Sequence, residues 1–268
     1  MPSFFVSFAA AVLLAVSPVA FAAECPLCNP AVNGDWKEVN RLIEADANLD
    51  AADKVGNTAL MWAAQEGHAD IAKVLLSAGA NPDAANNDGV TAFMWAAREG
   101  HADIAKVLLS AEANPNAATK KGTTALMDAA KGGHSEVARM LLSAGANPNA
   151  AAGNGKTALM IAANKGHSEV AKMLLSAGAN PNAADKRGGT ALIYAAIPGD
   201  SKTAKMLLSA GANPNTGPED GTTALSVAEY QWSNSSTKEK AKKYREVIRV
   251  LEAAGAKSLV AADSATQE

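Results

Sequence analysis

The four residues Thr124-Ala125-Leu126-Met127 recur, with small changes, at a fixed interval along this chain. Each copy begins with a threonine, and successive threonines are 33 residues apart. The other copies are Thr58-Ala59-Leu60-Met61, Thr91-Ala92-Phe93-Met94, Thr157-Ala158-Leu159-Met160, Thr190-Ala191-Leu192-Ile193 and Thr223-Ala224-Leu225-Ser226. A constant period of this length predicts stacked repeats and not a single globular core, because each short unit must bury its apolar face against its neighbours.

Each copy of the repeat predicts two short helices. In the copy that contains Thr58, Gly56 comes first and indicates a turn whose backbone angle other residues disfavour. Thr58 follows as an N-cap, since its hydroxyl can accept from a free amide at the start of a helix. Apolar residues at helical spacing then predict a first helix from about Ala59 to Glu66 and a second from about Ala69 to Ser77.

Stacking of these helix pairs predicts one continuous core. A leucine recurs on the inward side of every second helix, and no single repeat could bury it alone. The predicted core column is Leu75, Leu108, Leu141, Leu174 and Leu207. Hydrophobic residues make up 48% of the chain but aromatic residues only 4%, so alanine supplies much of the apolar content and favours closely packed helices.

The repeat closely resembles the ankyrin repeat. The motifs that carry the resemblance are Gly-x-Thr-Ala-Leu, then Ala-Ala-x-x-Gly-His, then Val-Leu-Leu-Ser-Ala-Gly-Ala-Asn-Pro, and they extend over about Cys25 to Ala256. The resemblance implies an all-α solenoid of stacked helix–turn–helix units with projecting β-turn fingers. It also implies a concave groove that binds other proteins.

Two departures from the family pattern have structural consequences. The usual Thr-Pro-Leu-His of the family stands here as Thr-Ala-Leu-Met, and only Pro26 keeps the proline. The missing histidine removes one hydrogen bond per repeat, so we expect the fingers to be less rigid. Glu112 replaces the glycine that ends the second helix in other copies, which should cost about 1 kcal/mol at that position.

The repeat pattern divides the chain into successive segments. An N-terminal signal peptide is predicted at 1–22, and a disordered tail at 257–268. The ankyrin repeat domain between them, 23–256, is predicted to comprise a degenerate N-terminal cap at 23–53, repeats at about 54–86, 87–119, 120–152, 153–185 and 186–218, and a C-terminal cap repeat with an insertion at 219–256. The basic insertion is interpreted as a capping device, with a docking patch for an acidic partner as the alternative.

The first residues indicate export from the cytoplasm. Phe4 to Val16 is almost wholly apolar and uncharged, and Ala20-Phe21-Ala22 offers small residues for a cleavage site. The apolar run is short for a membrane span, so none is expected after the signal is removed. The predicted location is therefore the periplasm or the outside of the cell.

The histidines and cysteines are the candidates for metal or redox chemistry. His68, His101, His134 and His167 occupy one repeat position, and neighbouring repeats lie about 8–10 Å apart, too far for two of them to share a zinc ion. We interpret them as caps on the turn between the helices, and we predict no metal site. Cys25 and Cys28 are interpreted as a possible disulfide, or as unpaired thiols, that pins the N-terminal cap; a metal or redox role is the alternative.

Other residues give no sign of catalysis or of nucleic-acid binding. The chain has no Gly-x-Ser-x-Gly motif, phosphate loop or paired-carboxylate motif, so we predict neither an enzyme nor a cofactor. The formal net charge of −3 gives no global signal for nucleic acid or for an anionic membrane.

Positions that vary between copies are the candidates for partner binding, because positions that stay constant serve the stack. One such column runs along the first helix, a second faces the groove by resemblance, and a third lies at the fingertips. The candidate residues are Trp62, Gln65, Trp95, Arg98, Asp128, Lys131, Asn164, Lys165, Tyr194, Lys54, Lys120, Lys121 and Arg187. For the first of these columns, inter-repeat packing is the alternative to exposure in the groove.

These observations predict an exported, monomeric ankyrin-repeat scaffold that binds a partner protein through its concave face and fingers. Two alternatives remain open at this point. One is a thiol-dependent redox or stress-protection protein that uses Cys25 and Cys28, and the other is a purely structural spacer.

Overall fold

The computed structural model describes residues 25–257, and within them the chain forms helices and no extended strand. The predicted signal peptide at 1–22 and nearly all of the predicted tail lie outside the described residues. The helices are α2 (Cys28–Asn33), α3 (Trp36–Glu44), α4 (Ala59–Glu66), α5 (Ala69–Ser77), α6 (Ala92–Glu99), α7 (Ala102–Ser110), α8 (Ala125–Gly132), α9 (Ser135–Ser143), α10 (Ala158–Lys165), α11 (Ser168–Ser176), α12 (Ala191–Ala196), α13 (Ser201–Ser209), α14 (Ala224–Ser233) and α15 (Lys238–Ala253). The all-α prediction is confirmed.

Local capping residues fix where each first helix begins and ends. The Thr58 hydroxyl accepts from the Met61 amide at 3.4 Å, and the equivalent threonine caps every later first helix in the same way. Gly67 ends α4 with φ 85, in the left-handed region where a glycine is favoured. The bounds of α4 and α5 are therefore those expected from the sequence.

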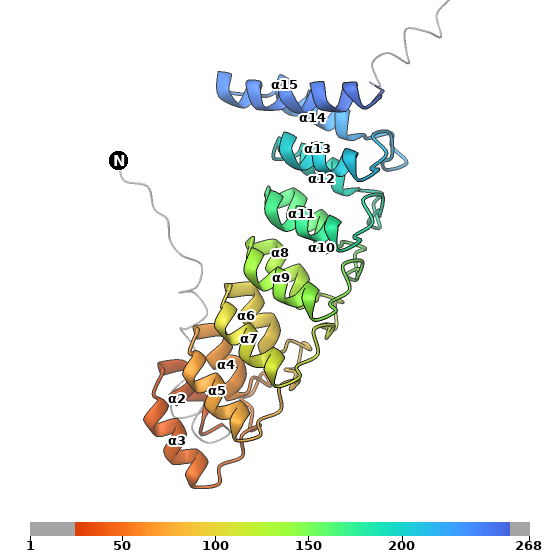
Figure 1. Cartoon of the computed structure of the whole chain (residues 1–268). Helices are drawn as coiled ribbons and strands as arrows, with labels where there is room; N and C mark the ends of the chain where they lie inside the picture. The colour runs from red at the N-terminus through yellow and green to blue at the C-terminus, as the bar shows by residue number, and fades with distance from the viewer. Residues whose placement is uncertain (1–24, 258–268) are drawn as a thin grey trace, which may run out of the picture.

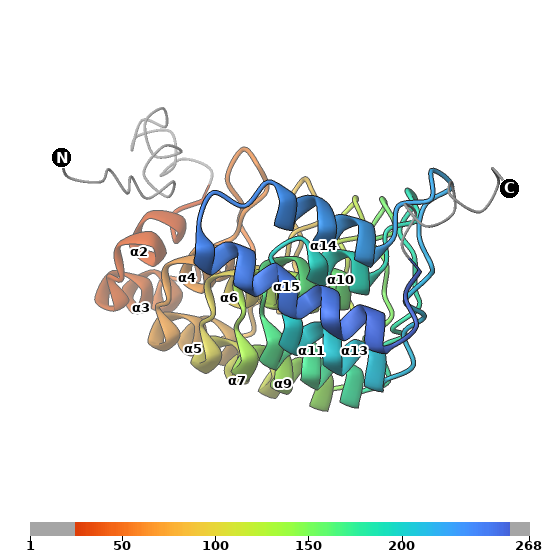
Figure 2. The same cartoon turned by 90° about the horizontal axis from the view of Figure 1, so that it is seen from above.

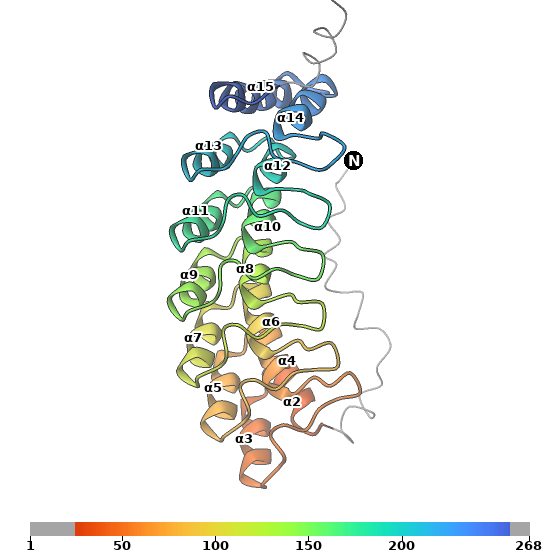
Figure 3. The same ribbon diagram turned by 90° about the vertical axis from the view of Figure 1, so that its right-hand side faces the viewer.

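Successive helix pairs stack into a curved solenoid (Figure 1). Seen from the side, second helices, first helices and fingers form three parallel rows (Figure 3). Neighbouring first helices lie closer together than neighbouring second helices, so the stack bends toward the first helices and makes their side concave. Fully buried alanines such as Ala63 and Ala96 permit this close approach.

The core runs without a break along the stack. The predicted leucine column, Leu75, Leu108, Leu141, Leu174 and Leu207, is fully buried. Met61, Met94 and Met127, which stand where the family usually has histidine, are also buried in the core. In these repeats the lost hydrogen bond is thus replaced by burial of an apolar side chain, which itself stabilises the fold.

Main-chain hydrogen bonds tie each finger to the next from the finger of Lys54 to that of Lys186, although the sequence predicted less rigid fingers. Within a finger, Ala118 and Thr124 form an isolated antiparallel bridge, as do the equivalent pairs of four other repeats. Between fingers, the Lys120 amide donates to the Asp88 carbonyl at 2.9 Å, and the Gly153 amide donates to the Lys121 carbonyl at 2.7 Å. These five fingers therefore form a ladder that does not need the missing histidine.

Both ends of the described stack carry atypical repeats. At the N-terminal end, Cys25 and Cys28 are joined by a disulfide, and both residues are fully buried. At the C-terminal end, α15 packs beside α14, the last first helix, and is longer than the other second helices (Figure 2). Its Val247 and Leu251 are buried, whereas most of its charged side chains face outward. Between residues 25 and 257, no helix has both the length and the apolar character needed to cross a membrane.

Candidate functional site: the inner face

The candidate site is the concave side of the stack, which we call the inner face. It consists of the fingertips and of two columns of side chains on the first helices. The helix column comprises Trp62, Trp95, Asp128, Ile161, Tyr194 and Val227, and the groove column comprises Gln65, Arg98, Lys131, Asn164, Ile197 and Tyr230, each of these with the residue that follows it.

The aromatic residues of the helix column are half-buried, and Trp62 and Tyr194 have hydrogen-bond partners in their own fingers. Trp62 Nε1 donates to Asp53 Oδ2 at 3.1 Å, and the Tyr194 hydroxyl donates to Asp185 Oδ2 at 2.6 Å. Each bond joins a helix residue to the residue nine positions earlier. Trp62 and Tyr194 were predicted as partner contacts, but much of their surface and their polar atoms serve the joint between helix and finger.

The Tyr194–Asp185 bond changes the pKa of both groups. Burial first, and then the hydrogen bond to Asp185, raise the pKa of Tyr194 to about 12. Burial acts to raise the pKa of Asp185, but hydrogen bonds from Tyr194 and from the amides of Gly189 and Arg187 outweigh it and keep that pKa below its ordinary value. The Lys156 ammonium lies over the Tyr194 ring, 4.5 Å from its centroid.

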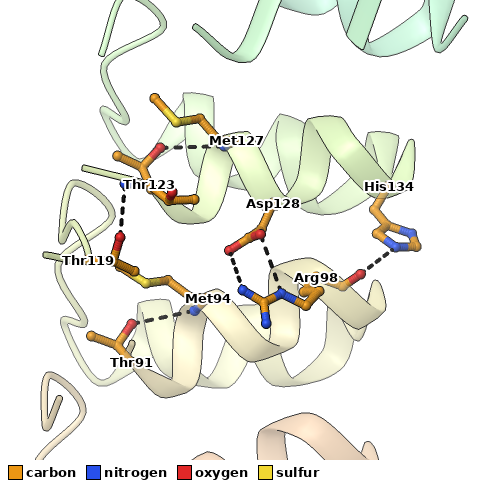
Figure 4. A network of polar contacts seen from close by, with 9 residues as sticks. Thr91, Met94, Arg98, Thr119, Thr123, Met127, Asp128 and His134 are labelled. Carbon is orange, nitrogen blue, oxygen red and sulfur yellow. Dashed lines mark hydrogen bonds and ion pairs between the residues drawn. The ribbon is translucent and has the colours of Figure 1, made fainter. Parts of the chain in front are cut away.

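Arg98 and Asp128 form an ion pair between neighbouring repeats (Figure 4). Arg98 Nε lies 3.4 Å from Asp128 Oδ1, and its guanidinium stacks 4.6 Å from the centroid of the Trp95 ring. The Asp128 side chain is only 5% exposed. Burial raises the pKa of Asp128, and the Arg98 charge offsets part of that shift. These three predicted contact residues therefore form one cluster between repeats, which leaves little of Asp128 for a partner.

Six of the predicted cations have exposed side chains and no ion pair. The ion pairs formed by residues 25–257 are Glu38–Arg41, Arg98–Asp128, Glu136–Arg139 and Lys205–Glu246. The predicted cations outside them on the inner face are Lys54, Lys120, Lys121, Lys131, Lys165 and Arg187. Two other predicted residues are uncharged: Gln65 donates to Glu66 Oε1 at 3.1 Å, and Asn164 is half-buried.

Two residues of the inner face, Lys156 and Tyr230, were not predicted from the sequence. Lys156 lies over Tyr194, and its proximity depends on how the finger folds back toward the helix. Tyr230 is 67% exposed and stands one period of 33 residues after Ile197. Extension of the groove column by one more repeat could have found Tyr230 from the sequence.

The histidines tie neighbouring repeats together and do not cap their own helices. His134 Nε2 lies 3.0 Å from the Arg98 carbonyl oxygen of the preceding repeat (Figure 4), and His68, His101 and His167 make the equivalent contact. Each of the four occupies the N-cap position of the helix that follows it, but its side chain makes no capping hydrogen bond. The predicted cap on the turn is thus corrected to a bond between repeats. No group of three metal-ligating side chains occurs in the described part of the chain.

The fifth member of this column is an aspartate. Asp200 Oδ1 accepts from the Thr203 amide at 3.0 Å and caps α13. No side chain of the next repeat donates to the Asn164 carbonyl within the described residues. One repeat further along, a tyrosine makes the contact that the histidines make elsewhere: the Tyr244 hydroxyl donates to the Ile197 carbonyl at 3.1 Å.

Comparison with known proteins agrees with this geometry. A family model for ankyrin repeats in three copies matches residues 79–152, 108–185 and 147–218, and a model for a single ankyrin repeat matches residues 55–87. A search of curated proteins finds no match to the chain. Ankyrin repeats generally mediate contacts between proteins and act as scaffolds without enzymatic activity. The matched residues make up more than half of the sequence, and the chain therefore belongs to the ankyrin repeat family.

Proposed function

We propose that this protein is an exported scaffold that binds one partner protein without covalent chemistry, through the groove column and fingertips of its inner face. The observation that carries the proposal is the set of six exposed cations that have no ion pair on this face. Side chains that serve the stack have partners within it, as Arg98 and His134 do. Cations that form no ion pair within the stack remain available for a second molecule.

The proposal of export rests on the apolar run from Phe4 to Val16 and on the small residues that follow it. The buried disulfide between Cys25 and Cys28 supports it, since disulfides persist mainly in oxidising compartments. The same burial disfavours the redox alternative, because a thiol–disulfide exchange partner needs access to a sulfur atom. Cell fractionation and N-terminal sequencing of the mature protein test this part directly.

Partner binding is tested by reversal of two charges on the inner face. The variant Lys131→Glu with Lys165→Glu should lose a partner that the unmodified protein captures from the exported fraction. Both side chains are exposed, so the fold should be retained. The matched control reverses Lys106 and Lys172, which occupy one repeat position on the second helices α7 and α11.

The two variants have different expected outcomes. The control should capture the partner as well as the unmodified protein does. Equal capture by the inner-face variant would refute binding through this face, and a protein with no specific partner in that fraction would favour the structural spacer.

A further inference from the structure

The inner face changes character along its length, and this gradient indicates the kind of segment that it binds. In the first two full repeats, the second residue of each groove-column pair is acidic: Glu66 and Glu99. In the middle repeats the column presents Lys131 and Lys165, with the fingertip cations beside them. In the last repeats it presents Ile197 and then Tyr230. One face thus joins an acidic, a basic and an apolar section.

The basic section stands out because the chain as a whole is acidic. Its formal net charge is −3, yet residues 120–187 place Lys120, Lys121, Lys131, Lys156, Lys165, Lys186 and Arg187 on the fingers and first helices. The two aspartates of that section are already engaged, Asp128 with Arg98 and Asp185 with Tyr194. The uncompensated charge of the basic section is therefore positive.

The apolar section consists of side chains that the stack leaves uncovered. Ile197 is 39% exposed and Tyr230 is 67% exposed, and they occupy consecutive repeats of the groove column. The hydrogen bond from Tyr244 to the Ile197 carbonyl fixes the backbone beneath the first of them. Trp232 is also exposed, but Arg245 of α15 stacks on its ring at 5.3 Å, so it is less available as an anchor.

From this arrangement we infer that the partner contributes a segment with acidic side chains at one end and large apolar side chains at the other. The acidic end lies against Lys131, Lys165 and the neighbouring fingertips, and the apolar end lies against Ile197 and Tyr230. The inference rests on the proposed function and adds the chemistry of the partner to it. Apolar anchors supply affinity at such an interface, while the charges set register and speed association.

The repeat spacing sets the distance between the two ends of the segment. Lys131 and Ile197 are two repeats apart, which corresponds to about 16–20 Å for helices packed at about 8–10 Å. An extended chain covers that distance in about five or six residues. A helix laid along the groove would need about eleven to thirteen residues.

Selection from a random library of displayed peptides tests the inference without knowledge of the natural partner. The unmodified protein serves as bait, with peptides long enough for either conformation. Enriched peptides should carry an excess of Asp and Glu at one end and of aromatic or aliphatic residues at the other, at a separation that fits one of the two estimates. Their binding should weaken as salt is added.

Two inner-face variants then locate the bound peptide. Lys131→Glu with Lys165→Glu, and separately Ile197→Ser with Tyr230→Ser, should each weaken binding by about tenfold or more, the effect of losing one strong contact. The control variant with Lys106 and Lys172 reversed should bind as the unmodified protein does. Circular dichroism of each variant confirms that the fold is intact.

Different failures have different meanings. Enriched peptides without an acidic excess, or unaffected by the Lys131 and Lys165 reversal, would overturn this inference and leave the proposed function standing. A single-stranded oligonucleotide bound more tightly than the peptides through the same lysines would also overturn it. Failure to enrich any peptide over a blank surface would count against both the inference and the proposed function.

Discussion

The end of α7 holds a non-glycine residue in a left-handed conformation, and Glu112→Gly should stabilise the protein. Glu112 has φ 59, whereas Gly79 and Gly145 at the same repeat position have φ 99 and 83. A side chain in this region costs about 1–2 kcal/mol. Glycine also gives the unfolded chain more conformational freedom, which lowers the free energy of unfolding by about 0.5–1 kcal/mol and offsets part of this gain. The net gain in the free energy of unfolding should be about 0.5–1 kcal/mol.

The assay is equilibrium unfolding in urea, followed by circular dichroism. The transition midpoint should rise while its slope stays unchanged, because the surface exposed on unfolding is the same. Gly145→Glu is the matched reverse change. A Cβ added there meets no atom within 4 Å, so the substitution adds backbone strain and no collision, and it should lose about as much stability as Glu112→Gly gains.

The two results together decide whether backbone strain is the cause. A Glu112→Gly variant no more stable than the unmodified protein would refute the reasoning. So would a Gly145→Glu variant that costs nothing, since the two substitutions exchange the same two residue types, in opposite directions, at the same left-handed position of the repeat.

Three further substitutions test the joints of the stack by the same unfolding measurement. Thr124→Ala removes the hydroxyl that caps α8 and should cost about 1 kcal/mol. His134→Ala removes the hydrogen bond to the Arg98 carbonyl and should also cost about 1 kcal/mol. Glutamine can still donate a hydrogen bond, so a His134→Gln variant as unstable as His134→Ala would show that the lost hydrogen bond is not the cause. Asp128→Asn should gain stability relative to the unmodified protein as pH rises above about 3.8, the ordinary pKa of the group. Burial raises the pKa of folded Asp128, so the folded state binds the proton more tightly than the unfolded state, and the stability of the unmodified protein falls as the proton leaves. A difference in the free energy of unfolding between the two proteins that stays constant with pH would exclude this cause.

Helix bounds could be predicted from the sequence because local residues set them. Thr58 and Gly67 delimit α4 through interactions within a few positions, and every later repeat keeps an N-cap threonine. The leucine column could be predicted for a similar reason, since the helical period alone places Leu75 on the inward face. Such features depend on short-range geometry and survive stacking unchanged.

Contacts between repeats could not be predicted in the same way. His134 reaches a carbonyl 36 residues earlier, and Arg98 reaches Asp128 30 residues later. These partners depend on the distance between helix pairs and on side-chain rotamers, neither of which the repeat pattern specifies. For that reason the sequence identified Arg98 as a candidate for partner binding, while the structure gives it a partner within the stack.

The proposed groove crosses a joint between repeats that lacks the histidine hydrogen bond of the earlier joints. At the joint between α10 and α12, Asp200 replaces the histidine, and no side chain of the next repeat reaches the Asn164 carbonyl within the described residues. A segment bound to Lys165 on one side and to Ile197 on the other would bridge this joint from outside. Because each repeat is held by its neighbours, contacts across the joint stabilise the bound stack as well as the complex. Binding in the proposed groove and the stability of the stack would therefore be thermodynamically coupled at this joint, where the 33-residue spacing continues but the histidine hydrogen bond does not.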